Sequence, residues 1–181
     1  VVLPMHNNER QIRSTVHDLL DISVMTRTPF KLVIVDDGST DDTPNLVSTY
    51  VERSLVRYIR QENQGPSAAR NLGVIHATGD LIAFLDADDT WLPDKLQAQR
   101  DWLVAHPRAS MASGAMIWWH VFRDRRKLVV YRPLSQARLR REICVQNVVG
   151  NPSMVLIRRT ALDAAGPQDP LLRWGQDWDI F

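Results

Sequence analysis

Four short apolar runs in the first half of the chain constrain its fold more than any other feature. They are rich in β-branched or large aliphatic residues and mostly lack alternation, which is typical of strands buried on both faces. The runs are 1–3, 32–35, 56–59 and 81–85. Segments with helical spacing separate them, and Pro44 and Pro66 stand where first-turn prolines belong. This alternation predicts an α/β fold, with a Rossmann-like, doubly wound, mostly parallel sheet flanked by helices.

The second half has a different pattern. After a helix from residue 93 to about 104, we expect strands at 109–119, 127–131 and 153–157, and a short helix at 135–141. We find no internal repeat or low-complexity linker, so 1–181 is predicted to be a single domain with halves 1–106 and 107–181. The chain starts within an apolar run and stops in what resembles the start of a helix, so we expect a fragment truncated at both ends.

Composition narrows the function classes. The 22 basic and 21 acidic residues give a net charge of +1, so we expect no nucleic-acid partner. Cys144 is the only cysteine, which excludes an intrachain disulfide and favours a reducing, cytoplasmic location. No apolar stretch approaches the roughly 18 residues of a membrane-spanning helix. Eight basic residues against two acids between 123 and 142 are compatible with peripheral attachment to a cytoplasmic membrane face or with a solvated surface.

Acidic turns follow two of the apolar runs. Asp86, Asp88 and Asp89 follow the fourth run, and Asp36 and Asp37 end the second. Polar turns at 4–7 and 63–65 follow the other two runs. Any one of these turns is explained by the turn-forming preference of Asp, Asn, Gly and Pro. Because ligands bind beyond the carboxyl ends of parallel strands, four such turns predict one shared site.

The residue types suggest the ligand. Asp86 and Asp88 offer oxygens to Mg²⁺ or Mn²⁺, which keep coordination positions open for phosphates. Asp36 or Asp37 can accept hydrogen bonds from a base N–H or from ribose hydroxyls. The helix after residue 65 could hold an anion at its N-terminus, with Arg70 one turn inside. A structural ion pair is an equally good explanation of Arg70.

Taken together, these segments resemble the family 2 glycosyltransferases. The matching segments are PMHN at 4–7, DDGS at 36–39, NQGPSAARNLG at 63–73 and DADDTW at 86–91. The match extends from residue 1 to about 99, and WGQDWD at 174–179 looks like the Gly-x-x-Glu-Asp segment of that family. Gln176 departs from the family pattern, because it replaces the usual Glu before Asp177.

The resemblance implies a GT-A fold and inverting transfer from a UDP-, GDP- or dTDP-sugar to a hydroxyl of a glycan, lipid-linked or small-molecule acceptor. It also implies Mn²⁺ or Mg²⁺ at Asp88, Asp177 as the catalytic base, and a place in cell-envelope polysaccharide biosynthesis. Residues 1–106 would form the nucleotide-sugar-binding half and 107–181 an incomplete acceptor-side half. The implied nucleotide-sugar-binding residues are Pro4, Asn7, Glu9, Asp36, Asp37, Asn63, Gly65, Arg70, Asn71, Asp86 and Ala87.

Other interpretations remain open. The chain could be a non-catalytic nucleotide-sugar-binding module, and Asp177 could be a helix-cap or surface carboxylate. A sugar nucleotidyltransferase is less compatible, because the turn after the first strand lacks a Gly-rich basic loop. Trp118 and Trp119 could form a stacking platform for a sugar, but alternation along a strand predicts that at least one of them is buried.

Overall fold

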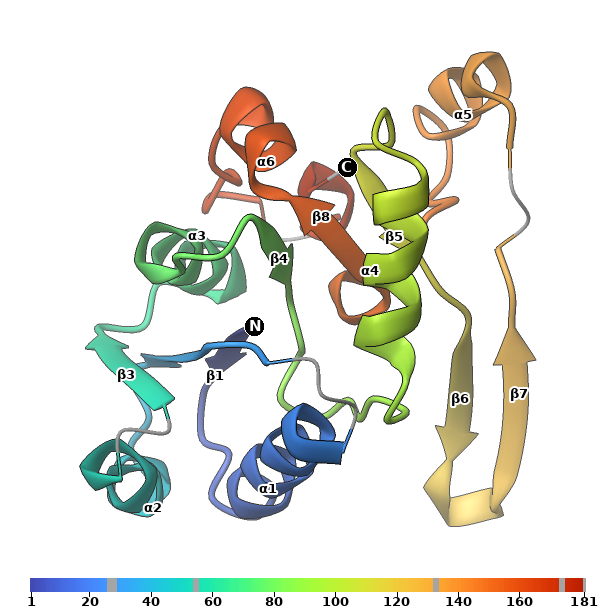
Figure 1. Ribbon diagram of the computed structural model, residues 1–181. Coiled ribbons are helices and arrows are strands. Elements are labelled where there is room, and N and C mark those ends of the chain that lie inside the picture. The colour runs from blue at the N-terminus through green and yellow to red at the C-terminus, as the bar shows by residue number, and fades with distance from the viewer. Residues whose placement is uncertain (26–28, 54–55, 132–133, 173–174, 181) are drawn as a thin grey trace.

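The computed structural model describes residues 1–25, 29–53, 56–131, 134–172 and 175–180 (Figure 1). The strands are β1 (Val2–Met5), β2 (Leu32–Asp37), β3 (Val56–Gln61), β4 (Leu81–Ala83), β5 (Met111–Ser113), β6 (Met116–His120), β7 (Arg125–Val129) and β8 (Val155–Arg158). The α-helices are α1 (Ile12–Met25), α2 (Thr43–Glu52), α3 (Pro66–His76), α4 (Lys95–Ala105), α5 (Gln136–Glu142) and α6 (Arg159–Ala165). Short 3₁₀ turns occupy Val121–Arg123, Pro152–Met154 and Trp178–Ile180.

A parallel sheet forms the first half, as predicted. Its strand order is β1-β2-β3, with Met5 opposite Asp36 and Asp37 opposite Gln61. The segment after β4 runs parallel to β1, where Leu85 N donates to Val2 O at 3.0 Å. The carboxyl ends of these four segments therefore meet at one edge of the sheet.

Helices cover both faces of this sheet. Every residue of β1 and β2 is buried, in agreement with their unbroken apolar runs. The apolar stripes of α1 and α2 pack on one face, and α3 packs on the other, where Ala69 meets Val33 and Val35 (Figure 1). At Gly73 the helix lies so close to β1 that an added Cβ would stand 2.2 Å from Val2 Cγ1.

The second half differs from the prediction in its strand boundaries. The predicted strand at 109–119 is wrong, because it divides at Gly114 into β5, which pairs with β8, and β6, which pairs with β7. The strand predicted at 153–157 begins at Val155, because Pro152–Met154 forms a 3₁₀ turn. β8 lies between β4 and β5 and is antiparallel to both.

The β6–β7 hairpin is exposed on both faces. Trp118 is 65% exposed and Trp119 is 50% exposed, so the expectation that alternation buries one of them is wrong. The alternation argument assumed a layer packed against one face of the strand, and the described residues provide none. Figure 1 draws the hairpin at the margin of the molecule, beyond α4. None of the described helices has the length and apolar character needed to cross a membrane.

Candidate functional site

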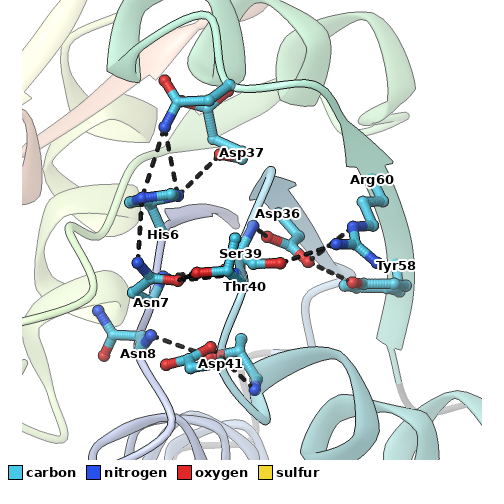
Figure 2. Close-up of polar contacts among 12 residues, drawn as sticks. His6, Asn7, Asn8, Asp36, Asp37, Ser39, Thr40, Asp41, Tyr58 and Arg60 are labelled. Atoms are coloured by element: carbon cyan, nitrogen blue, oxygen red, sulfur yellow. Dashed lines mark hydrogen bonds and ion pairs between the residues drawn. The ribbon is translucent and has the colours of Figure 1, made fainter.

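The turns after β1 and β2 are bonded to each other at the carboxyl edge of the sheet (Figure 2). Asn7 N donates to Ser39 Oγ at 2.9 Å, and Asn7 Oδ1 accepts from Thr40 N at 2.8 Å. Asn7 has a φ of 50°, a left-handed conformation that Asn tolerates better than most residues. His6 Nδ1 lies 2.9 Å from Asp37 O and 3.3 Å from Asn63 Nδ2, which brings the third turn to the same place.

Asp37 shapes the turn that opens α3. Its Oδ1 accepts from Gln61 Nε2 at 2.7 Å and from Gln64 N at 2.8 Å, and its Oδ2 accepts from Gly65 N at 2.8 Å. Asp37 is 5% exposed. The turn is also tightly packed, because a Cβ on Gly38 would stand 2.8 Å from Asn63 N. One buried carboxylate thus fixes the path from β3 into the helix.

Asp36 is buried beneath the turn. Its Oδ1 accepts from Ser39 N at 2.8 Å and its Oδ2 accepts from Tyr58 Oη at 2.5 Å (Figure 2). Arg60 Nε lies 3.7 Å from the same Oδ2. Burial raises the pKa of Tyr58 above its usual range, and the bond to Asp36 raises it further, so the tyrosine stays a proton donor. A contact between Asp36 and a nucleotide stays a prediction.

The Asp-rich turn after β4 is held by the segment that precedes β8. Asp86 N donates to Ser153 Oγ at 2.9 Å, and Trp91 Nε1 donates to Ser153 O at 2.7 Å. Asp89 Oδ2 accepts from Asn151 Nδ2 at 3.2 Å. Asp88 is exposed and accepts no hydrogen bond from the described part of the chain. Its carboxylate is therefore free to bind a ligand.

Arg70 joins three distant parts of the sequence. Its Nη2 lies 2.8 Å from Asp86 Oδ1 and 3.8 Å from Asp177 Oδ1. The side chain is 5% exposed, and its Nε and Nη1 are buried without a hydrogen-bond partner in the described residues. Such donors are costly to bury, so they are suited to an anionic ligand. The guanidinium of Arg70 thus forms ion pairs with both the Asp-rich turn and Asp177.

The acids of this region perturb one another. Burial raises the pKa of Asp177 above its usual range, Arg70 opposes this, and the carboxylates of Asp86 and Asp89 raise it further. Burial also raises the pKa of Asp89, where Ser153 opposes the shift and neighbouring acids of the turn add to it. Acids gathered in this way favour a cation among them.

The donor set suits a magnesium or manganese ion. No group of three or more potential ligands is assembled within the described ranges. Mg²⁺ is commonly held by only one or two carboxylates, with substrate phosphates and water as the other ligands. Asp88 has a free carboxylate, and Asp86 stands two residues before it on the same turn. The residues present therefore fit an ion shared with a diphosphate.

The remaining predicted residues occupy varied positions. Pro4 is buried within β1, and Ala87 is half-buried on the Asp-rich turn. Glu9 joins the first turn to the start of α2, because its Oε2 accepts from Asp42 N at 3.2 Å. The amide of Asn71 is bonded to the backbone of Gln168. Nucleotide contacts by these residues stay predictions.

Sequence reasoning missed several residues that build the site. Ser153 supports Asp86, Tyr58 supports Asp36, and Gln168 is bonded to both Asn71 and Gln176. Tyr58 could have been found from strand pairing, because it stands two positions from Arg60, the partner of Asp36 in the β2–β3 register. Nothing local in the sequence marks Ser153 or Gln168.

Solved structures define the fold class. The structure of S. aureus TarS residues 1–349 in complex with UDP has a TM-score of 0.72 and 21% identity, covering 98% of this chain and 52% of that one. The mannosyltransferase PcManGT from Pyrobaculum calidifontis in complex with GDP-Man and Mn²⁺ has a TM-score of 0.70 and 23% identity, covering 98% and 48%. The fold is that of the GT-A glycosyltransferases.

Sequence comparison then identifies the family. The family profile described as Glycosyl transferase family 2 matches residues 1–166, so the chain belongs to the family 2 glycosyltransferases. TuaG of Bacillus subtilis, a glycosyltransferase named for teichuronic acid biosynthesis, is 38% identical over 117 residues, or 63% of this chain and 45% of the relative. The chain spans about half or less of the length of the relatives and structures it matches.

Proposed function

We propose that this chain forms the donor site and catalytic centre of an inverting glycosyltransferase that uses a nucleotide-diphosphate sugar and a divalent cation. The observation that carries the proposal is the buried Arg70, which contacts Asp86 of the Asp-rich turn and Asp177 near the end of the chain. This arrangement supports the proposal, because it brings the turn proposed to hold the cation close to Asp177, the proposed base, as transfer requires.

The nucleotide would lie across the turns that follow β1, β2 and β3. Asp37 organises this surface by bonding Gly65 N and Gln64 N, and α3 presents its N-terminus there. A helix N-terminus and the unpaired donors of Arg70 both favour phosphate oxygens. UDP in the TarS structure and GDP-Man in the PcManGT structure support a nucleotide-sugar donor.

Asp88 would hold the cation, with Asp86 beside it on the same turn. Mn²⁺ in the PcManGT structure supports this assignment. A divalent cation supplies positive charge that stabilises the diphosphate as it departs with growing negative charge. The guanidinium of Arg70 would supply further positive charge next to Asp86.

Asp177 would act as the base. Inversion requires the acceptor hydroxyl to attack opposite the leaving group, and a carboxylate placed there accepts the hydroxyl proton. A carboxylate whose pKa is raised by burial is a stronger base than one in water, and Asp177 has this environment. The acceptor would be the hydroxyl of a glycan, a lipid-linked molecule or a small molecule, and the name of TuaG favours a cell-envelope polymer.

A non-catalytic nucleotide-sugar-binding module is the second candidate. Gln176 favours it, because the resemblance leads us to expect a Glu at this position. The two functions differ in whether the bound sugar donor is consumed.

Two substitutions test the assignment. Asp88→Ala should abolish the Mn²⁺-dependent thermal stabilisation by UDP or GDP, because the cation links protein to diphosphate. Asp177→Asn should retain that stabilisation but lower nucleotide release from UDP- and GDP-sugars by about 10²-fold or more. Asp18→Ala, which removes an exposed carboxylate from α1, is the control. Equal loss of binding in both variants would contradict the roles, and nucleotide binding without turnover in the unsubstituted protein would favour the module.

A further inference from the structure

A series of amides, in which Gln168 is buried and Asn71 is half-buried, connects α3 to the residue before Asp177. Asn71 Nδ2 donates to Gln168 O at 2.8 Å, and Asn71 Oδ1 accepts from Gln168 N at 2.9 Å. Gln168 is 7% exposed, and its Nε2 donates to Gln176 O at 2.8 Å. Three hydrogen bonds therefore lead from a helix to the peptide group that joins Gln176 to Asp177.

The side chain of Asn71 fixes both the position and the orientation of the Gln168 backbone. A single side-chain amide pairs with both the N–H and the C=O of one residue, so it fixes the Gln168 backbone in rotation as well as in distance. Gln168 then has its side chain directed toward the Gln176 carbonyl. Asn71 could not be replaced by an aliphatic residue without leaving two backbone groups of Gln168 unpaired.

A side chain on the other side of Asp177 is bonded to the same segment. Asp169 N donates to Asp179 Oδ2 at 2.5 Å, while the neighbouring Gln168 holds Gln176. The carboxylate of Asp177 contacts Arg70, which precedes Asn71 on α3. Two consecutive residues of α3 are thus linked to Asp177: Arg70 contacts its carboxylate directly, and Asn71 is connected through Gln168 to the carbonyl of the preceding residue.

We propose that Asn71 and Gln168 are positioning residues that set the location of the Asp177 carboxylate relative to the Asp-rich turn. This inference rests on the proposed function, in which Asp177 is the base. α3 starts at the turn shaped by Asp37, where the nucleotide is proposed to bind, and it carries both Arg70 and Asn71. One helix would therefore fix the positions of the donor-binding turn and of the proposed base relative to each other. A displacement of about 1 Å at a reacting group can lower a rate by about 10²-fold.

The chain offers a matched control for Gln168. Gln99 is also 7% exposed, and its Nε2 also donates to backbone carbonyls, those of Met154 at 2.7 Å and Ala112 at 3.1 Å. The Oε1 atoms of both glutamines are buried without a partner in the described residues. Gln168→Met and Gln99→Met therefore remove the same kind of donor at similar burial, and Met nearly preserves the length of the side chain.

Two readouts test the proposal. Hydrogen exchange of a peptide covering residues 175–180 needs no substrate, and Gln168→Met should accelerate it while Gln99→Met leaves it unchanged. With Mn²⁺ and UDP-GlcNAc or GDP-mannose, Gln168→Met should lower kcat for nucleotide release by about 10-fold or more while KM for the donor changes less than about threefold. Asn71→Ala provides a second variant that should reproduce both effects if Gln168→Met does not fold.

The outcomes separate this proposal from the proposed function. Unchanged exchange at 175–180 in both Gln168→Met and Asn71→Ala would overturn the positioning role, as would a kcat loss no larger than that of Gln99→Met. A parallel rise in KM would also overturn it, because that result would place the two residues in donor binding. If the unsubstituted protein consumes no sugar donor, the proposed function fails, and the exchange measurement alone decides whether the amides hold the segment around residue 177.

Discussion

Asp36 and Asp37 are adjacent in β2 but support different structures. Successive side chains of a strand point to opposite faces, so Asp36 is directed toward Tyr58 and Arg60 while Asp37 is directed toward Gly65. Asp36 accepts two hydrogen bonds from protein groups and Asp37 accepts three. Their main role in this structure is to organise the carboxyl edge of the sheet.

The Asp36–Tyr58 bond gives a prediction about stability. Tyr58→Phe removes the hydroxyl that donates to a fully buried carboxylate, so it should lower the free energy of unfolding by about 1.5–3 kcal/mol. Urea denaturation measures this change. Tyr131→Phe is the control, because no hydrogen bond of its hydroxyl is found among the described residues, and it should cost much less. Equal costs would show that the bond contributes little.

The half-buried Lys95 makes stability depend on pH. Lys95 Nζ lies 4.0 Å from the centre of the Trp91 ring and 3.4 Å from Val155 O, and burial lowers its pKa to about 7. The lysine of an unfolded chain has a pKa near 10.4, so between these values the unfolded state binds one more proton than the folded state. The contribution of Lys95 to the free energy of unfolding therefore rises with pH above 7.

Lys95→Met isolates this contribution. The difference in unfolding free energy between the unsubstituted protein and Lys95→Met should shift in favour of the unsubstituted protein between pH 7 and 9, by at most about 1.4 kcal/mol per pH unit. Urea denaturation at both pH values measures it. A difference that does not vary with pH would mean that the amine keeps its proton in the folded state.

At the scale of elements, α3 determines how the site is assembled. It begins at the turn shaped by Asp37 and packs against β1 through Gly73. Its Arg70 contacts Asp86 and Asp177, and its Asn71 is bonded to Gln168. The missing side chain at Gly73 allows the helix axis to approach the strand closely. In the proposed function, the position of this helix therefore controls the distance between the turns assigned to the donor and Asp177, the proposed base.

Gly73→Ala tests the close approach. The added methyl group would stand 2.2 Å from Val2 Cγ1, so the Val2 side chain or the helix must shift, and we expect a loss of about 1–3 kcal/mol in unfolding free energy. Differential scanning or urea denaturation measures it. Gly114→Ala is the control, because its added Cβ would meet its nearest neighbour at an ordinary 3.6 Å. A stable Gly73→Ala protein would contradict the packing described for α3.

The sequence predicted the elements of the first half better than those of the second. β1 and β2 are built on continuous apolar runs, β3 contains Val56, Tyr58 and Ile59, and each strand is followed by a turn, so the local sequence reveals these strands directly. The limits of β5 and β8 depend instead on pairing between positions more than 40 residues apart, as between Met111 and Ile157. Local periodicity contains no information on that pairing, and the predicted strand at 109–119 was wrong for this reason.

The same contrast applies to the site. Acidic turns after strands predicted that the Asp36–Asp37 and Asp86–Asp88 turns lie at one sheet edge, and the parallel topology agrees. Ser153 and Gln168 could not be predicted, because each is a common polar residue whose role comes from a distant contact. Ser153 is bonded to Asp86, which lies 67 positions earlier in the chain, and Gln168 is bonded to Asn71, which lies 97 positions earlier.

For the whole molecule, the two predicted halves are joined at the site. Arg70 from the first half contacts Asp177 from the second, and Ser153 from the second supports Asp86 from the first. The assignment of 1–106 to the donor and 107–181 to the acceptor stays a prediction. These contacts show that residues of both predicted halves build the candidate site.

The configuration of the released sugar tests the central claim most directly. Proton NMR can follow the hydrolysis of α-linked UDP-GlcNAc or GDP-mannose with Mn²⁺ and identify the anomer that forms first. Inverting chemistry with Asp177 as base predicts that the β-anomer appears first and that Asp177→Asn slows its appearance by about 10²-fold or more. Initial release of the α-anomer, or an unchanged rate in Asp177→Asn, would contradict the proposed mechanism.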